Sequence, residues 1–344
     1  MTAGGRALKV VLALVAGMTA AVATAPAEAG ILATVKARGH VICGVGDGPR
    51  GFSSVDKRGT WSGIEVDFCS ALAAAVFGDA KAVKFRLLAP SERFAAVQSG
   101  EVDVLARHVE ISLSRDTSLG LRFVAPLVYD GHAFLARKSQ SITSALELTG
   151  AKICLLSDVE SEQAVADYFG GQKMRHEVAR FENWQDAVKA YDGRGCTVLA
   201  SDMTTLTLTR MGLAHPAEHM ILPELISKLP LGPVIKQGDD EWFGIVRWTI
   251  NALVAAEELG VTSSNADAMR NAANAEARRL LGRDGDLGKR MGLNADWAFQ
   301  IVRQVGNYGE VFDRNLGAKS PLKMERRLNN LWTKNGLQYA LPFR

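Results

Sequence analysis

The chain has 344 residues, of which 47% are hydrophobic and 22% are charged, and 40 Lys and Arg nearly balance 37 Asp and Glu. Such a balance provides no basic stripe of the kind that nucleic-acid binding needs, so no nucleic-acid partner is expected. The length is sufficient for two lobes of ordinary domain size, each with its own core.

The N-terminal segment Met1 to Ala29 has the pattern of an export signal. Arg6 and Lys9 form a basic start, residues 10–22 are apolar, and residues 27–29 read Ala-Glu-Ala, the small-x-small pattern cut by signal peptidase. The apolar run is shorter than the roughly 20 residues that span a bilayer, and no cysteine follows the cut to carry a lipid. We therefore expect cleavage before Gly30 and a periplasmic or secreted protein, with a membrane anchor as the alternative.

The first part of the mature chain alternates strands and helices. Apolar spacing and the glycines at 78 and 100 predict the order β-α-β-α-β. Ser91 is expected to cap the second helix. The predicted elements are the strand His40–Val45, the helix Val66–Phe77, the strand Val83–Leu88, the helix Glu92–Gln98 and the strand Val102–Ala106.

A second unit of the same kind starts near Ala151, which predicts an α/β protein with two lobes. Its expected elements are the strand Lys152–Leu156, the helix Glu162–Phe169, a strand at His176–Phe181, the helix Asn183–Tyr191 and the strand Thr197–Ser201. Phe123–Lys138 and Leu229–Gln237 are interpreted as crossings between the lobes, and the chain from Asp240 as mostly helical, including Trp242–Leu259 and Asn294–Asn315. The expected domains are a signal peptide (1–29), the first part of lobe 1 (30–133), lobe 2 (134–231), and the return to lobe 1 with C-terminal helices (232–344).

The four cysteines lie far apart and form no C-x-x-C pair, which disfavours a zinc cluster. After export, disulfides are chemically permitted. Pairing Cys43 with Cys69 and Cys154 with Cys196 would join neighbouring elements within each half. Three pairings are open on sequence alone, and buried free thiols are the alternative.

Several other signals are rejected. Residues 44–48 (Gly-Val-Gly-Asp-Gly) follow a strand like a dinucleotide loop, but the fingerprint requires a helix at once and a turn-rich stretch comes instead. His108 and Glu110 are too sparse for a metal site, and no G-x-S-x-G nucleophile elbow is present. We expect no metal and no cofactor.

Three phrases in the first lobe carry a family resemblance: Trp61 to Phe68 (WSGIEVDF), residues 94–103 (F-x-x-VQSGEVD) and Ser112 to Asp116 (SLSRD). Together with residues 232–243 and 304–310, they make the chain similar to family 3 bacterial solute-binding proteins, most closely to the general L-amino-acid-binding proteins of polar amino acid ABC transporters. The resemblance implies the type II periplasmic binding protein fold, with two α/β lobes on a two-strand hinge and a helical C-terminal extension. It also implies a monomer that closes on a small amino-acid-like ligand and docks on an inner-membrane ABC permease.

The ligand site can be placed partly from the residues and partly from the resemblance. Arg115 follows a predicted strand by a short loop, which places it at the carboxyl edge of the sheet, where α/β proteins bind ligands. Its guanidinium is suited to a carboxylate. The alternative is an ion pair with Asp116 or Glu110. The resemblance implies that Arg115, in the phrase that begins at Ser112, clamps the ligand carboxylate and that Asp202 takes the ammonium, although Asp202 could also cap a helix. It further implies aromatic walls at Phe52 and Trp61, with core packing as the alternative for both. Tyr129-Asp130-Gly131 lies on the first crossing and is interpreted as the hinge.

Two places depart from the family pattern. Glu110 stands where a threonine is usual and would face Arg115. The loop that normally receives the ligand carboxylate reads Ser157-Asp158-Val159-Glu160-Ser161-Glu162, so that Asp158 or Glu160 could cap the following helix and fill the carboxylate's place. The resulting hypothesis is a reduced affinity for a free carboxylate and a preference for a cationic or amine-bearing ligand or a different small solute. The alternative is that Glu110 turns outward and leaves Arg115 free.

Two further functions remain open: an interaction or sensory protein that no longer transports, and a cleft enzyme that uses Glu110 or Asp158 as an acid. The expectation is a receptor and not an enzyme, since nothing in the sequence pairs a second catalytic group with either acid.

Overall fold

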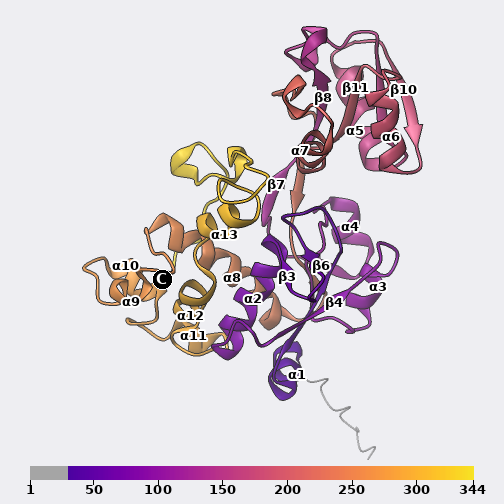
Figure 1. The fold of residues 1–344 in the computed structure, drawn as a ribbon. Coiled ribbons are helices and arrows are strands. Elements are labelled where there is room, and N and C mark those ends of the chain that lie inside the picture. The colour runs from indigo at the N-terminus through magenta and orange to yellow at the C-terminus, as the bar shows by residue number, and fades with distance from the viewer. Residues whose placement is uncertain (1–29) are drawn as a thin grey trace, which may run out of the picture.

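The computed structural model describes residues 30–344, without the side chain of Ser118. Two α/β lobes stand one above the other and are joined by a narrow waist, and the C-terminal helices lie beside the lower lobe (Figure 1). We define lobe 1 by the sheet β4-β1-β5-β14-β6 and lobe 2 by the sheet β10-β9-β11-β8-β12. The predicted signal peptide, residues 1–29, lies outside the described residues.

Both sheets have the same strand order. In lobe 1, β1 lies between β4 and β5 and is parallel to both, while β14, which enters from the other lobe, is antiparallel to β5 and β6. In lobe 2, β9 lies parallel between β10 and β11, and β8 is antiparallel to β11 and β12. This arrangement brings the carboxyl ends of β5, β9 and β11 toward the waist.

The lobe 1 elements are α1 (Ile31–Arg38), β1 (Val41–Val45), β2 (Ser54–Val55), β3 (Trp61–Ser62), α2 (Ile64–Phe77), β4 (Val83–Leu87), α3 (Arg93–Gln98), β5 (Val104–Leu105), α4 (Leu113–Ser118), β6 (Leu121–Phe123) and β14 (Val234–Lys236). The lobe 2 elements are β8 (His132–Arg137), β9 (Ala151–Leu156), α5 (Val159–Gly171), β10 (His176–Phe181), α6 (Trp184–Asp192), β11 (Val198–Asp202), α7 (Met203–Gly212) and β12 (His219–Ile221). The C-terminal helices are α8 (Asp240–Glu258), α9 (Ala266–Met269), α10 (Ala275–Leu280), α11 (Leu287–Arg290), α12 (Trp297–Val305) and α13 (Tyr308–Asn315).

The waist is a pair of antiparallel strands, β7 (Val128–Asp130) and β13 (Leu229–Leu231), with Tyr129 opposite Pro230. These strands fall inside the two segments predicted to cross between the lobes, so the prediction of a two-strand hinge is confirmed. The proposed domain boundaries at 133/134 and 231/232 remain a prediction.

Glycines define the limits of α2. Gly63 precedes the helix at φ 133°, and a Cβ there would lie 1.9 Å from the carbonyl oxygen of Phe52, so only glycine fits. Gly78 ends the helix in the left-handed region at φ 71°, as predicted.

Two expectations about helices are wrong. Helix α3 begins at Arg93 with Glu92 as its N-cap residue and no side-chain cap, so Ser91 does not cap it. The helical stretch predicted at 294–315 is two helices, because Gly306 leaves the helical region at φ 96° and Asn307 starts α13 with a capping box to Glu310.

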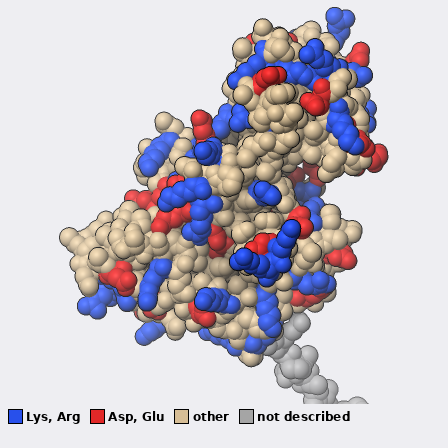
Figure 2. Space-filling view, in the orientation of Figure 1, with Lys and Arg blue, Asp and Glu red and all other residues tan. Residues whose placement is uncertain are grey.

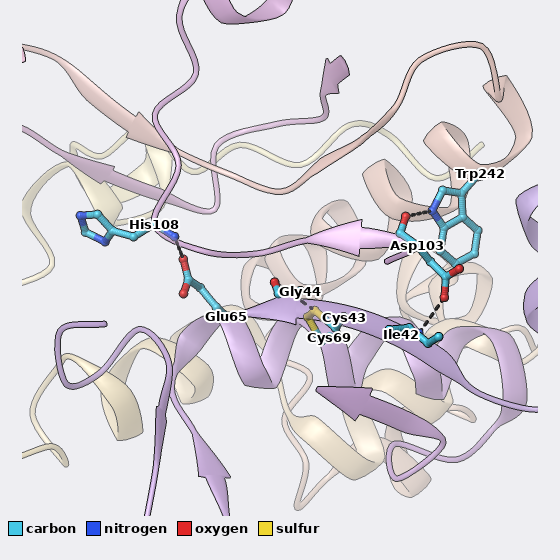
Figure 3. The surroundings of a disulfide bond; sticks show 8 residues. All are labelled: Ile42, Cys43, Gly44, Glu65, Cys69, Asp103, His108 and Trp242. Atoms are coloured by element: carbon cyan, nitrogen blue, oxygen red, sulfur yellow. Dashed lines mark hydrogen bonds between the residues drawn. A yellow bond between two sulfur atoms is a disulfide. The ribbon is translucent and has the colours of Figure 1, made fainter. Parts of the chain in front are cut away.

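Both predicted disulfides are present. Cys43 of β1 bonds to Cys69 of α2 in lobe 1 (Figure 3), and Cys154 of β9 bonds to Cys196, just before β11, in lobe 2. Each bond therefore ties a central strand to a neighbouring element of its own lobe, and no described cysteine is free.

Candidate functional site

A cleft of about 1010 Å³ lies between the lobes and is lined from both of them. Lobe 1 contributes residues from the loop after β1 and from the segment between β5 and α4. Lobe 2 contributes the start of α5, the end of β11 and one side of α6 and α7. The charged and histidine residues of the lining are Asp47, Arg93, His108, Glu110, Arg115, His132, Asp158, Glu160 and Asp202.

Arg115 lies on α4 and makes two ion pairs, one to each lobe. Its Nη1 lies 3.1 Å from Oε2 of Glu110, and its Nη2 contacts Oε1 of Glu160 across the cleft. The expected ion pair with Glu110 is therefore present, and Glu160 adds a second partner. Burial raises the pKa of Glu110; Arg115 opposes this shift and the nearby Glu160 adds to it.

Asp158 and Asp202 occupy equivalent places in lobe 2, each at the N-terminus of a helix that follows a strand. Asp158 Oδ1 accepts from the backbone N–H of Ser161 at 2.7 Å and caps α5. Asp202 Oδ1 accepts from the N–H of Thr205 at 2.8 Å and caps α7. Capping orients each carboxylate at the cleft wall, so both remain lining residues.

The other four predicted contacts do not line the cleft. Phe52 is only 1% exposed and belongs to the lobe 1 core, where its ring meets that of His108 edge-on at 4.4 Å. Trp61 packs on Phe85. Ser112 precedes α4, with its hydroxyl 3.3 Å from that of Ser114. Val159 is 80% exposed and lines a separate pocket of about 450 Å³.

These differences have physical reasons. The Gly51 to Gly63 turn folds back on α2, which draws Phe52 inward and leaves Trp61 on the outer strand β3. Val159 is the first residue of α5, and the helix directs that position away from the cleft while Asp158 and Ser161 face it. The contacts of these lining residues with a ligand remain a prediction.

His132 and His108 line the cleft and were not predicted as site residues. His132 Nδ1 lies 2.7 Å from Ser227 Oγ, its Nε2 lies 3.3 Å from Ser161 Oγ, and burial lowers its pKa. His108 has φ 46°, and its backbone N–H donates to the buried carboxylate of Glu65 (Figure 3). The sequence offers no local signal for these roles, since isolated histidines are compatible with many environments.

Arg93, at the start of α3, is the remaining cleft guanidinium. Its Nε is buried without a hydrogen-bond partner, and among residues 30–344 it has no ion pair. Burial lowers the pKa of Arg93, the nearby Arg115 and Arg107 lower it further, and the charge of Glu160 opposes the shift.

Asp130 lies beneath the cleft, at the end of hinge strand β7. It accepts from Thr204 Oγ1 at 2.7 Å and from the N–H groups of Gly131 and Met203, which ties the hinge to the start of α7. Burial and the charge of Asp202 raise the pKa of Asp130 to about 6.

The described part of the chain holds no group of three or more His, Cys, Asp and Glu placed to bind a metal ion. None of its helices has the length and hydropathy needed to cross a membrane. On the face shown in Figure 2, acidic and basic side chains occur on both lobes.

Comparison with known proteins places this geometry in a family. Residues 41–265 match the bacterial extracellular solute-binding proteins, family 3. The general L-amino acid-binding periplasmic protein AapJ of Rhizobium johnstonii is 47% identical over 98% of this chain and 99% of that protein. The glutamate/glutamine/aspartate/asparagine-binding protein BztA of Rhodobacter capsulatus is 44% identical over 94% of this chain and 96% of its own.

Solved structures agree with the fold. A periplasmic binding protein of an ABC transporter from Brucella ovis, with glutathione bound, superposes with a TM-score of 0.83 at 47% identity, over 92% of this chain and all of that chain. A cysteine-binding protein from Campylobacter jejuni, at 18% identity and a TM-score of 0.53, shares the fold over 73% of this chain and 98% of its own. The expected type II periplasmic binding protein fold is confirmed, and the chain belongs to the family 3 bacterial extracellular solute-binding proteins.

Proposed function

We propose that this chain is the periplasmic receptor of an ABC importer and that it binds an amino acid or a related amine in the interlobe cleft. The observation that carries the proposal is the cleft of about 1010 Å³, lined by charged side chains from both lobes. It occurs in a chain whose relatives, over nearly their full length, are amino-acid-binding proteins by name.

The mechanism is closure about the hinge. A ligand that contacts Arg115 or Glu110 on lobe 1 and Asp202 or Asp158 on lobe 2 stabilises the closed arrangement over the open one. The lobes are joined through the paired strands β7 and β13, so a small change in their dihedral angles moves one lobe against the other.

The remaining expectations about setting and partners form part of the same proposal. Export through the segment 1–29 would deliver the protein to the periplasm, where a monomer would hand its ligand to an inner-membrane permease. The balanced charge supports the expectation that nucleic acid is not a partner.

Catalysis is not part of the proposal. Glu110 is engaged by Arg115, and Asp158 is engaged by the helix α5 that it caps. The relatives at 44–47% identity are binding proteins by name.

The test uses protein expressed with its own N-terminal segment and purified from the periplasm. N-terminal sequencing is expected to give Gly30. Thermal unfolding is then measured with L-amino acids, amines, polyamines and glutathione. A ligand at a hundredfold excess over its Kd should add about 2.7 kcal/mol of stability, and X-ray scattering should show a smaller radius of gyration. If no compound changes the stability or the radius of gyration, the receptor function is contradicted. If any compound is turned over, the enzyme function is favoured.

A further inference from the structure

Arg115, one of the two arginines that line the cleft, is already paired with the protein's own carboxylates. Arg115 Nη1 donates to Glu110 Oε2 at 3.1 Å and to the Glu110 carbonyl oxygen at 3.3 Å, and Nη2 donates to Glu160 Oε1. Both terminal nitrogens of the guanidinium are thus engaged, one within lobe 1 and the other across the cleft. The bidentate fork that would hold a ligand carboxylate is occupied.

A ligand carboxylate would therefore have to displace one of these acids or crowd against both. Arg115 and Glu110 are about four-fifths buried, which strengthens the repulsion between neighbouring carboxylates. Glu160 lies in the first turn of α5, two residues after the capping Asp158, so a second negative charge lies close to it. The place that would receive a carboxylate is held by negative charge from both lobes.

The rest of the lining is acidic as well. Asp47, Asp158 and Asp202 face the same cavity, and Arg93 is the one described guanidinium there without an ion pair. With Arg115 occupied, Arg93 is the lining guanidinium at which a ligand carboxylate could still bind. Against this, the five lining acids outnumber the two arginines, so the cavity as a whole favours a cation.

We propose that Glu110 and Glu160 determine the specificity of this receptor by acting as built-in counter-ions of Arg115, and that the preferred ligand is an amine or guanidine without an α-carboxylate. The proposal rests on the receptor function proposed above and names the class of its ligand. Glu110 and Glu160 occupy Arg115 in place of a ligand carboxylate. The remaining acids of the lining bind the cationic group of the ligand.

The test compares ligand pairs that differ only by the carboxylate: arginine and agmatine, lysine and cadaverine, ornithine and putrescine. Isothermal calorimetry on the native protein is expected to show at least tenfold tighter binding of the decarboxylated member in one pair or more. Glutathione, which carries two carboxylates, is expected to bind more weakly than that member.

The variants remove the counter-ions. Glu160→Gln and the double variant Glu110→Thr, Glu160→Thr should free Arg115 and shift the preference within a pair at least tenfold toward the carboxylate-bearing member. Glu162→Gln is the matched control, because Glu162 lies in the same helix, pairs with Arg180 at 2.8 Å and does not line the cleft. It should leave the preference unchanged.

The outcomes separate the inference from the receptor function. Equal or tighter binding of the amino acids or glutathione by the native protein overturns the inference and leaves the receptor function standing. An unchanged preference in Glu160→Gln also overturns it, because this substitution removes the charge and keeps the side-chain size. Absence of binding for every compound, in native protein and variants alike, contradicts both.

Discussion

The two lobes share a strand order but are stabilised in different ways. The lobe 1 sheet packs against α2, and α2 in turn packs against α8, α12 and α13 from the C-terminal part of the chain; Trp242, Tyr308 and Phe312 are fully buried there. Lobe 2 has two smaller cores, one on each face of its sheet, centred on Phe134 with Phe169 and on Tyr191 with Leu199. The comparison indicates that lobe 1 is the rigid frame and that lobe 2 depends more on local restraints.

The C-terminal part of the chain also reaches the hinge. The side-chain amide of Asn329 accepts from the N–H of Tyr129 and donates to its carbonyl oxygen, both at 2.8 Å, as a neighbouring strand would. Tyr308 donates its hydroxyl to the carbonyl oxygen of Leu127 at 2.9 Å. The hinge strand β7 is therefore restrained from the lobe 1 side, while lobe 2 is held to it chiefly through Asp130.

The largest expected effect comes from removing the lobe 2 disulfide. By loop closure, the 42-residue separation of Cys154 and Cys196 is worth about 4 kcal/mol, and the 26-residue separation of Cys43 and Cys69 about 3.5 kcal/mol. Because lobe 2 has the smaller cores, Cys154→Ser with Cys196→Ser should unfold lobe 2 ahead of lobe 1. Urea unfolding followed by hydrogen exchange measures this.

The matched variant is Cys43→Ser with Cys69→Ser. It should lower overall stability and leave a single transition, since α8, α12 and α13 still support lobe 1. If this variant instead separates the lobes, or if both variants give one coincident transition, the contrast between rigid frame and dependent lobe is wrong.

A second test concerns Asp130, the link between the hinge and lobe 2. Its pKa of about 6 exceeds the value of about 3.9 for an unfolded aspartate, so its contribution to stability is fully present below about pH 4 and is lost as the pH rises through 6. Asp130→Asn removes this dependence. Between pH 7 and pH 4, the native protein should gain roughly 2–3 kcal/mol relative to the variant.

Urea titrations at several pH values measure the difference, with Asp167→Asn on the exposed side of α5 as the control. A pH-independent difference between native protein and Asp130→Asn would show that the Asp130 carboxyl titrates as it does in the unfolded chain. The hinge would then have no buried acid that responds near neutral pH.

The smallest expected effect is that of Asn329→Ala. It leaves the N–H and C=O groups of Tyr129 without their partner, which should cost about 2 kcal/mol and speed amide exchange along β7. Asn330→Ala is the control, because the Asn330 side chain makes no hydrogen bond to the hinge. Equal exchange in the two variants would mean that Asn329 does not restrain the hinge.

Local pattern predicted many of the elements. The strand at His176–Phe181 has the predicted bounds, and Asn183, placed by prediction at the start of the next helix, caps it. Both disulfides match the pairing that was favoured within each half, although the sequence left three pairings open. These features depend on periodicity, on capping residues and on sequence separation, all of which are readable along the chain.

The site was harder to predict. Arg115, Glu110, Asp158 and Asp202 line the cleft, whereas Phe52 and Trp61 pack within lobe 1. An aromatic residue near glycines is compatible with a core or a pocket, and only the path of the turn decides between them. The contact of Glu160 with Arg115 joins residues 45 positions apart on different lobes, and no spacing rule reaches that far.

The sequence by itself determined the two α/β units, the crossings between them and the family, because each depends on short-range pattern or on motifs of neighbouring residues, whereas the choice among the three possible disulfide pairings needed the structure. The tertiary structure decided which charged and polar groups meet: Glu160 with Arg115, Asp130 near Asp202, and Asn329 with the hinge backbone. Long-range electrostatic partners are set by how the lobes approach each other, since the strength of a charge pair depends on distance and burial, and neither is written along the chain.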